Sequence, residues 1–290
     1  MEQYRNNPRN EGSGVFTAVP HRSRCPFKCE GCAFNEGRSY LEPLEETLPN
    51  VPEPREMRYR VVCINDWHDS SNSHLEIVQG MRGYPLRFFN TIVPYFLHEF
   101  DAPVVLTLNA REDTDTKFWQ LEEIPANLMF VRFRVNTWNI KLLWQAVDYY
   151  TGTRRVPLIL DWVEYPKVSA IPTGYRKYYK ADQHDGRRIW RVWFEEWRRV
   201  ADLFTDDILV YTCGRGPRRQ DRLCRNCGNC LREYFATRER MLAVMAKAEG
   251  PKLPQRQAED LRHARWRDRL DRGFRKGGVQ EGCDATAALL

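Results

Sequence analysis

Three cysteines with an unusual spacing lie near the start of the chain. Cys25, Cys29 and Cys32 form a C-x3-C-x2-C pattern within RCPFKCEGCAFNEG. A disulfide would use two of these thiols and leave one over, and a structural zinc site usually takes its cysteines in C-x2-C pairs. Three thiolates suit a [4Fe–4S] cluster in which one iron keeps an open position. The motif therefore predicts a cluster that can also bind a small chelating molecule.

A zinc site is the alternative for the same motif. His21 lies shortly before Cys25 and would complete a Cys₃His ligand set, which is one of the known structural zinc compositions. The spacing of these four residues is not a common zinc pattern. The sequence therefore favours the iron–sulfur cluster and leaves zinc as the alternative.

A second group of thiols lies in CGRGPRRQDRLCRNCGNC, nearer the C-terminus. Its members are Cys213, Cys224, Cys227 and Cys230. The last three repeat as C-x2-C-x2-C, as in bacterial ferredoxins, whereas zinc ribbons use two separated pairs. We expect a second metal site here, with [4Fe–4S] favoured over zinc, acting either as a structural staple or in redox or substrate binding. Nearby arginines would compensate thiolate charge or meet a phosphate: Arg215, Arg218, Arg219, Arg222 and Arg225.

Composition favours metal or redox chemistry over a disulfide framework. The chain has nine cysteines in 290 residues and begins with a polar segment that does not resemble a secretory signal. No apolar run approaches the roughly 20 residues of a membrane span. These features predict a cytoplasmic protein with no membrane partner. The net charge of +6 permits an anionic partner without requiring one. Cys63 is expected to be a buried small hydrophobe, and Cys283 to be incidental.

Apolar, β-branched runs alternate with helical patterns along most of the chain. Strands are predicted at 14–20, 58–65, 102–110, 127–136, 155–162 and 206–214. Helices are predicted at 75–83, 86–100, 139–150, 187–204 and 231–249. In the helix at 187–204, Trp190, Trp193, Trp197 and Val200 have the spacing of a buried face, with an aromatic platform for a nucleobase as the alternative.

The order of these elements predicts the fold and its divisions. Strands that alternate with helices favour an α/β fold, here a partial (β/α)6-type barrel with a cysteine-rich, mostly helical C-terminal extension. We expect a flexible arm over residues 1–14, the barrel over 15–210, the auxiliary metal segment over 211–250, and a charged helical tail over 251–290 with a disordered end. The tail could contact a nucleic acid or acidic partner, although a solvated helix fits its mixed charges better.

The C-x3-C-x2-C motif after a first strand, followed by repeated β/α units, resembles the radical S-adenosylmethionine (radical SAM) superfamily. The resemblance covers the motif and the order of elements to about residue 214. It implies that Cys25, Cys29 and Cys32 hold the cluster and that the open iron binds SAM. Reductive cleavage of SAM would then give a 5′-deoxyadenosyl radical that abstracts hydrogen from a substrate. It also implies an electron donor such as flavodoxin or ferredoxin.

Two departures from the family pattern are visible. Gly31 stands where the family usually has an aromatic residue, and no Gly-Gly-Glu segment follows the second strand. Polar residues occupy that place in the chain, so the resemblance implies that they hold SAM: Asn65, Asp66, Asp69 and Ser70. Other polar residues follow later strands, where β/α folds build their sites or cap helices: Asn109, Arg111, Glu112, Asp113, Asn136, Thr137, Asn139, Asp161, Glu164 and Tyr165. Arg111 and Asn136 are the preferred candidates among these.

The sequence thus predicts an enzyme of the radical SAM type whose substrate is not specified. No general base is evident, and hydrogen abstraction would not need one. A nucleic acid, a peptide and a small metabolite all stay open as substrates, with a slight preference for an anionic one. The alternative is a zinc-stabilised, nucleic-acid-binding protein without catalytic activity, which would be colourless and bind in a salt-sensitive manner.

Overall fold

The computed structural model describes residues 4–111, 115–184 and 187–249. The chain divides into two compact units, Met1–Met241 and Leu242–Leu290. The sheet and both groups of thiols belong to the first unit. The predicted tail over 251–290, with Cys283, lies outside the described residues, as do Glu112 and Asp113.

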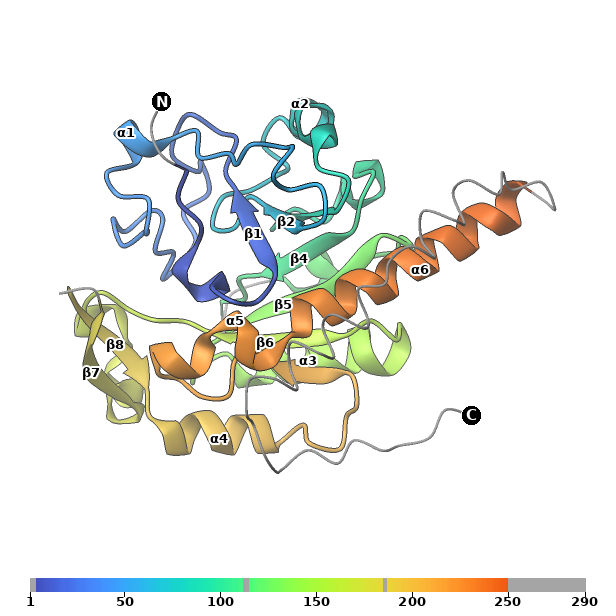
Figure 1. The fold of residues 1–290 in the computed structure, drawn as a ribbon. Coiled ribbons are helices and arrows are strands. Elements are labelled where there is room, and N and C mark those ends of the chain that lie inside the picture. Colours follow the sequence, from blue (N-terminus) through green and yellow to red (C-terminus); the bar gives the residue numbers. More distant parts are fainter. Residues whose placement is uncertain (1–3, 112–114, 185–186, 250–290) are drawn as a thin grey trace, which may run out of the picture. The chain divides into compact units, whose positions relative to one another are not determined.

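A curled sheet of seven parallel strands forms the centre of the first unit (Figure 1). The strands follow one another in chain order across the sheet, each pairing in parallel with the next. They are β1 (Val15–Ala18), β2 (Val61–Ile64), β3 (Arg87–Thr91), β4 (Val104–Leu108), β5 (Leu128–Val135), β6 (Leu158–Trp162) and β9 (Val210–Thr212). The predicted α/β fold is confirmed, and the sheet curls as half of a barrel.

Helices and 3₁₀ turns make the connections between these strands. The connecting helices are α1 (Leu44–Thr47), α2 (His74–Gly80), α3 (Ile140–Val147) and α4 (Phe194–Asp202), and α5 (Cys224–Cys227) and α6 (Asn229–Glu249) follow the last strand. Short 3₁₀ turns occupy the crossovers from β3 to β4 and from β4 to β5. Among the described residues, no helix is both long enough and apolar enough to cross a membrane.

The two faces of the sheet differ in chemistry, and β5 shows this most clearly. Val131, Phe133 and Val135 are fully buried in the hydrophobic core. Arg132 and Arg134 alternate with them and therefore project from the opposite face, since side chains alternate along a strand. Burial of the three apolar side chains stabilises the sheet, and the two arginines project from its other face.

The predicted helix over 86–100 is wrong. Residues 87–91 form β3 between β2 and β4, and only a 3₁₀ turn at Leu97–Glu99 follows. The apolar residues of RFFNTIVPYFLHEF imitate a helical period because a buried strand and a buried loop follow each other directly. Pairing on both sides of β3 outweighs any local helical preference.

The predicted helix over 187–204 is wrong in its first half. Arg187–Val192 is strand β8, which pairs antiparallel with β7 (Tyr179–His184) to form a hairpin, and α4 begins only at Phe194. Trp197 and Val200 are buried as expected, but Trp193 is 42% exposed. The four residues of the predicted apolar face therefore do not share one helical face.

Residues 4–14, for which composition predicts a flexible arm, lie against the sheet in this structure. Asn7 and Asn10 are buried, and a 3₁₀ turn spans Pro8–Asn10. The Tyr4 hydroxyl donates a hydrogen bond to the Thr17 carbonyl in β1 (2.8 Å). Asn7 Nδ2 donates to Asp66 Oδ2 at the end of β2 (2.5 Å). This segment therefore reaches the polar ends of the strands.

Candidate functional site

A cavity of about 430 Å³ opens on the face that carries Arg132 and Arg134. Both groups of thiols line it, although they lie far apart in the sequence. The thiols at its wall are Cys25, Cys29, Cys32, Cys63, Cys213, Cys224 and Cys230. Its volume falls within the range usual for small-molecule and cofactor sites. The cavity brings together groups that the sequence could only place separately.

The first group of thiols lies on a loop between β1 and α1. Cys25 and Cys32 pack against the apolar cluster of Val19, Phe34, Leu41 and Leu44. Cys29 accepts a hydrogen bond from Asn109 Nδ2, at 3.3 Å from its sulfur. N–H donors to sulfur are common around iron–sulfur clusters, where they adjust the properties of the thiolate.

The position of Gly31 in the first thiol loop requires glycine. Its φ of +63° lies in the left-handed region, and a Cβ at this position would come within 2.2 Å of Val163 Cγ1. Its carbonyl accepts hydrogen bonds from Arg38 (3.3 Å) and Arg134 (3.4 Å). The loop therefore docks on the end of β6 by close backbone approach, which only glycine permits.

The segment after β2 supplies polar groups to the same cavity. Asn65, Asp66 and Asp69 line it, as do Trp67 and His68. Asn65 and Trp67 adopt left-handed conformations, with φ of 60° and 85°. Such strain in non-glycine residues is often concentrated at functional sites. Asn65 Oδ1 is buried without a hydrogen-bond partner in the described part of the chain. An unpaired buried acceptor beside a cavity is suited to a ligand donor.

Asp69 and Ser70 mainly form hydrogen bonds within the protein, which fix the conformation of the segment after β2. The Asp69 carboxylate accepts hydrogen bonds from Ser71 N (2.7 Å), from Thr91 Oγ1 (3.0 Å) and from Ile92 N (2.6 Å). It thereby ties the end of β2 to the end of β3. Ser70 is buried and does not line the cavity; its Oγ accepts from Asn65 Nδ2 at 3.1 Å. The Asp66 carboxylate is less engaged than that of Asp69, since it is held by Asn7 at one oxygen.

Arg111 and Asn136 are placed away from the cavity wall. Arg111 is exposed, after the end of β4. Asn136 is buried, and its Oδ1 accepts hydrogen bonds from Trp138 N (3.2 Å) and Asn139 N (2.9 Å) in the turn before α3. Its observed contacts are those of a turn-forming residue, which is the alternative role that asparagine has at helix starts.

The second group of thiols lies between β9 and α6. Cys213 follows β9, Cys224 and Cys227 are the ends of α5, and Cys230 lies in the first turn of α6. Gly214 fixes the chain behind Cys213, because its φ is +89° and a Cβ would come within 2.5 Å of the Asp221 carbonyl. The close approach folds residues 214–222 back on themselves, which brings Cys213 toward the other three thiols.

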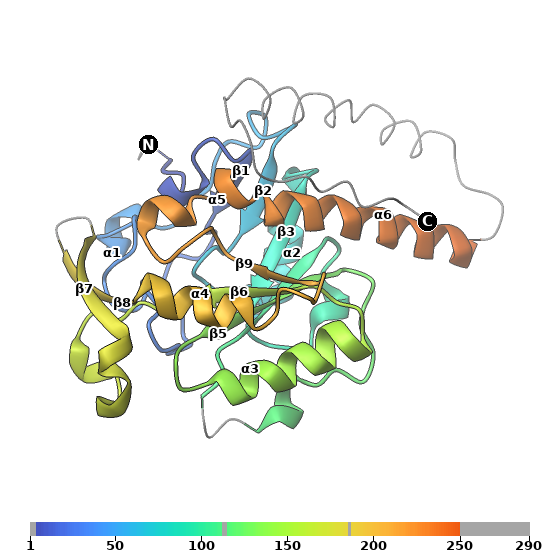
Figure 2. The ribbon, with the colours of Figure 1, turned by 90° about the horizontal axis from the view of Figure 1, so that it is seen from below.

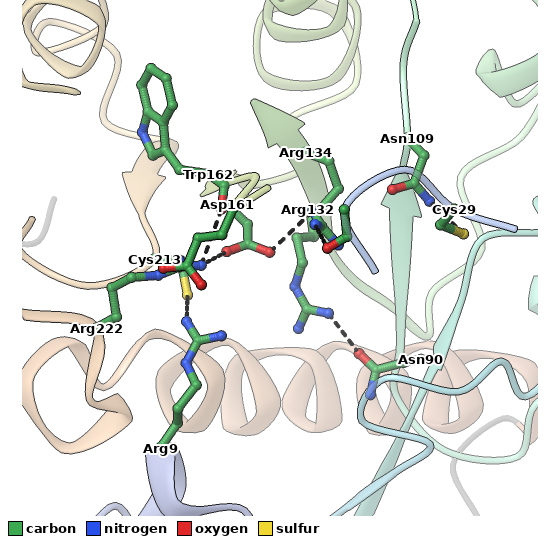
Figure 3. A network of polar contacts seen from close by, with 12 residues as sticks. Arg9, Cys29, Asn90, Asn109, Arg132, Arg134, Asp161, Trp162, Cys213 and Arg222 are labelled. Carbon is green, nitrogen blue, oxygen red and sulfur yellow. Dashed lines mark hydrogen bonds and ion pairs between the residues drawn. The ribbon is translucent and has the colours of Figure 1, made fainter. Parts of the chain in front are cut away.

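Arginines from separate elements lie near Cys213 and Asp161 (Figure 3). Arg9, in the N-terminal segment, places Nη2 3.9 Å from Cys213 Sγ. Arg222 forms ion pairs with Asp161 in β6 (2.7 Å) and with Glu164 just after β6 (2.9 Å). Although burial opposes it, Arg222 and Arg134 hold the pKa of Asp161 below its usual range. Among the described residues, three arginines, Arg9, Arg134 and Arg222, face only two carboxylates here. Their excess positive charge can balance a further negative group at the cavity wall.

Burial controls the protonation of the thiols themselves. Burial raises the pKa of Cys25 to about 12 and the pKa of Cys29 to about 11. It raises the pKa of Cys213 and Cys230 as well, against the opposing effect of Arg9 on Cys213 and of Arg132 on Cys230. Without a metal these thiols would therefore remain protonated at neutral pH, and metal binding would release their protons.

Several cavity residues were not anticipated from the sequence. Arg9, Asn90, Arg132 and Arg134 all line it, and Asn90 donates a hydrogen bond to the buried Cys63 thiol (2.9 Å). The alternation of arginine with Val131, Phe133 and Val135 was a readable signal for an inward-facing charged row. The role of Arg9 had no signal, because its position depends on how the N-terminal segment packs.

The donor set can be tested against the implied cofactors. In the described part of the chain, no three His, Cys, Asp or Glu side chains already converge as a metal site. The thiols gather around the cavity with N–H donors directed at Cys29, Cys63 and Cys213. Asn65 Oδ1 and Asn109 Oδ1, in two cavity-lining residues, are buried without partners among the described residues. Soft sulfur ligands beside unfilled oxygen acceptors fit an iron–sulfur cluster with an amine-bearing ligand.

His21 does not face the cavity with the cysteines. Its ring stacks on His68, with ring centroids 3.8 Å apart, and its Nε2 accepts a hydrogen bond from Asn65 Nδ2 at 3.2 Å. Burial next to His68 lowers the pKa of His21 to about 4. This arrangement favours a role in positioning Asn65 over the Cys₃His zinc alternative.

Comparison with known proteins assigns no relative. No family model, no curated protein and no solved structure matches the chain. The function must therefore be inferred from the cavity and its residues.

Proposed function

We propose that this chain is a radical SAM-type enzyme that cleaves S-adenosylmethionine reductively. The observation that carries the proposal is one cavity shared by both groups of thiols and the polar segment after β2. Cys25, Cys29 and Cys32 would hold the catalytic [4Fe–4S] cluster. When bound, that cluster with SAM supplies a 5′-deoxyadenosyl radical for hydrogen abstraction, using an electron from a donor such as flavodoxin or ferredoxin.

The chain's own residues would bind and orient SAM. Asn65 Oδ1 and Asn109 Oδ1 are buried acceptors whose hydrogen-bonding capacity is unfilled within the described residues. The Asp66 carboxylate lines the cavity and is held by Asn7 at one oxygen. An ammonium group placed among such oxygens gains charge-assisted hydrogen bonds. His21, which stacks on His68, would orient the Asn65 side chain by accepting a hydrogen bond from its Nδ2.

The second group of thiols would hold an auxiliary metal in the same cavity wall. Cys213, Cys224, Cys227 and Cys230 are close enough for their charges to act on one another. Arg9 and Arg132 supply cations on their cavity side. A thiolate-bound [4Fe–4S] or zinc centre carries net negative charge, and the excess of arginine over Asp161 and Glu164 offsets it.

Anaerobic reconstitution with iron and sulfide tests the proposal. The wild-type chain should become brown, show a reduced-cluster EPR signal that shifts on adding SAM, and form 5′-deoxyadenosine with a reductant, as measured by mass spectrometry. Cys29→Ser should lose the SAM-dependent shift and the deoxyadenosine. Cys283→Ser, which removes a thiol from neither group, should behave as wild type.

One outcome would instead support a zinc-stabilised protein without this activity. That outcome is a colourless protein with zinc at both groups of thiols and no deoxyadenosine above the reagent background, whether or not the chain has been reconstituted.

A further inference from the structure

The β7–β8 hairpin lies between β6 and α4, and its second strand, Arg187–Val192, falls where the sequence pattern predicts helix. The segment from Tyr175 to Trp193, YRKYYKADQHDGRRIWRVW, mixes basic and aromatic residues closely. Figure 1 and Figure 2 both show the hairpin at one end of the unit, apart from the seven-stranded sheet. Tyr179 and Val192 anchor it in the main core, whereas most of its basic side chains stay outside that core and call for another explanation.

Most of its basic side chains are not neutralised by the described part of the protein. Among the described residues, ion pairs with carboxylates are absent for Lys177, Lys180, Arg187 and Arg188. By contrast, Arg191 pairs with Asp182 at 3.1 Å and is buried. The cations other than Arg191 are exposed or half-buried. Clustered cations of this kind repel one another and attract a polyanion, and they release counterions when one binds.

Aromatic side chains lie between these cations. Trp193 is 42% exposed and Phe194 is 40% exposed. Lys180 Nζ lies 4.6 Å from the centre of the Trp193 ring, and Lys180 is paired across the strands with Arg191. On the opposite face of the hairpin, Arg188 lies 5.4 Å from the centre of the Trp190 ring. Exposed rings beside cations are the components of a platform on which nucleic-acid bases stack. An acidic peptide would use the charges but would offer no flat faces to the rings.

The hairpin also reaches the cavity. Arg187 and Ile189 line its wall. They share one hairpin face with Arg191, because residues two apart along a strand point to the same side. Arg191 on that face donates a hydrogen bond to the Pro217 carbonyl (3.3 Å), next to the second group of thiols. The basic surface is therefore continuous with the cavity wall at Arg187.

We propose that the β7–β8 hairpin binds single-stranded nucleic acid and directs it to the cavity. A single strand is favoured over a duplex because only unpaired bases expose their faces to Trp193 and Phe194. A base must also leave a duplex before it can enter an enclosed site. Naming this strand as the substrate rests on the proposed function; the binding itself does not.

The test measures binding of a fluorescently labelled oligonucleotide of about 12 nucleotides to the full chain by anisotropy, over a range of salt concentrations. The hairpin variant Lys180→Gln/Arg187→Gln/Arg188→Gln should bind at least about tenfold more weakly than wild type. Its salt slope should fall by about 2, since each lost phosphate contact on a single strand contributes about 0.7. Trp193→Ala should weaken binding at least about fivefold through lost stacking.

A matched control removes the same charge elsewhere. Arg55→Gln/Arg58→Gln/Arg60→Gln changes three exposed arginines before β2, none of which lines the cavity, and two of which also lie over aromatic rings. This variant should bind like wild type.

Three results would overturn the proposal. They are equal binding by the hairpin and control variants, binding of poly-glutamate as tight as that of the oligonucleotide, and preference for duplex over single strand. The assay uses neither SAM nor reductant. Failure of SAM cleavage with intact oligonucleotide binding would therefore refute only the proposed activity, and the reverse would refute only the hairpin's role.

Discussion

The two groups of thiols line one cavity but are held in contrasting ways. Cys25 and Cys32 rest on apolar side chains, and the carbonyl of Gly31 anchors their loop. The second group lies among charges drawn from separate elements, with Arg9 from the N-terminal segment and Arg222 from its own loop. The first loop is thus positioned by packing and leaves its polar side open. The second depends on an ion-pair network that joins distant parts of the chain.

The largest effect should come from Asp161→Asn. This change removes the carboxylate that lies 3.5 Å from Arg134 and 2.7 Å from Arg222; Arg222 keeps its pair with Glu164, whereas Arg134 loses its carboxylate partner. Removing one partner from a buried ion pair costs about 3–5 kcal/mol, because a charge stays buried and uncompensated. Anaerobic urea unfolding measures it. Asp202→Asn, at an exposed pair with Arg198, should cost under about 0.5 kcal/mol. Equal costs would show that the network does not hold the second group.

The next prediction compares the two groups of thiols by substituting one glycine beside each group. Gly31→Ala and Gly214→Ala should each cost about 3 kcal/mol, since both combine a left-handed φ with a Cβ contact below 3 Å. Gly228→Ala has a φ of +65° but an open surrounding, and should cost about 1 kcal/mol. Metal analysis should show loss at the first group for Gly31→Ala and at the second for Gly214→Ala. If either substitution alone caused loss of metal at both groups, the two groups would depend on each other structurally.

A smaller effect concerns the N–H donors to sulfur. Arg9→Gln removes a cation beside Cys213, and Asn109→Ala removes the donor to Cys29. Outer partners of metal ligands typically contribute about 10–100-fold to metal affinity. Each variant should lose metal to a chelator faster than wild type, Arg9→Gln more than Asn109→Ala because it also removes charge. The reverse order would mean that charge is not what distinguishes the groups.

The last effect is the pH dependence from His21, which appears only when the pH is lowered. Its folded pKa of about 4 lies below the ordinary 6.5, so stability from the neutral ring is complete above pH 6.5. That stability is lost as the pH falls from 6.5 toward 4. His21→Phe keeps a ring against His68 but cannot titrate, so its melting temperature should fall less over this range. If the melting temperature of His21→Phe fell as much as that of wild type, the pH dependence would come from other titrating groups.

The sequence predicted the strands that carry continuous β-branched runs, and it placed polar residues such as Asn65, Asn109 and Asp161 at their ends. The sequence-based prediction failed where the local residue pattern favours a helix but the segment pairs with neighbouring strands. RFFNT became β3 because β2 and β4 bond to it on both sides. RRIWRV became β8 because β7 lies beside it. Neither partner can be inferred from a local window, since strand pairing is a long-range property.

The same limit applies to the site. Each group of thiols was recognisable from spacing alone, but their shared cavity follows from the curl of the sheet. The row of Arg132 and Arg134 was readable as alternation within an apolar strand. Arg9 was not, because the polar segment before β1 gives no apolar period to interpret.

The N-terminal segment has a practical consequence for work on this protein. Asn7 holds Asp66 beside the first group, and Arg9 holds Cys213 in the second. Trimming residues 1–14 as a dispensable leader would therefore remove a contact to Asp66 and a contact to Cys213 at once. Such a shortened chain could still assemble its sheet while losing part of the cavity wall, and it would be a misleading starting point for any activity screen.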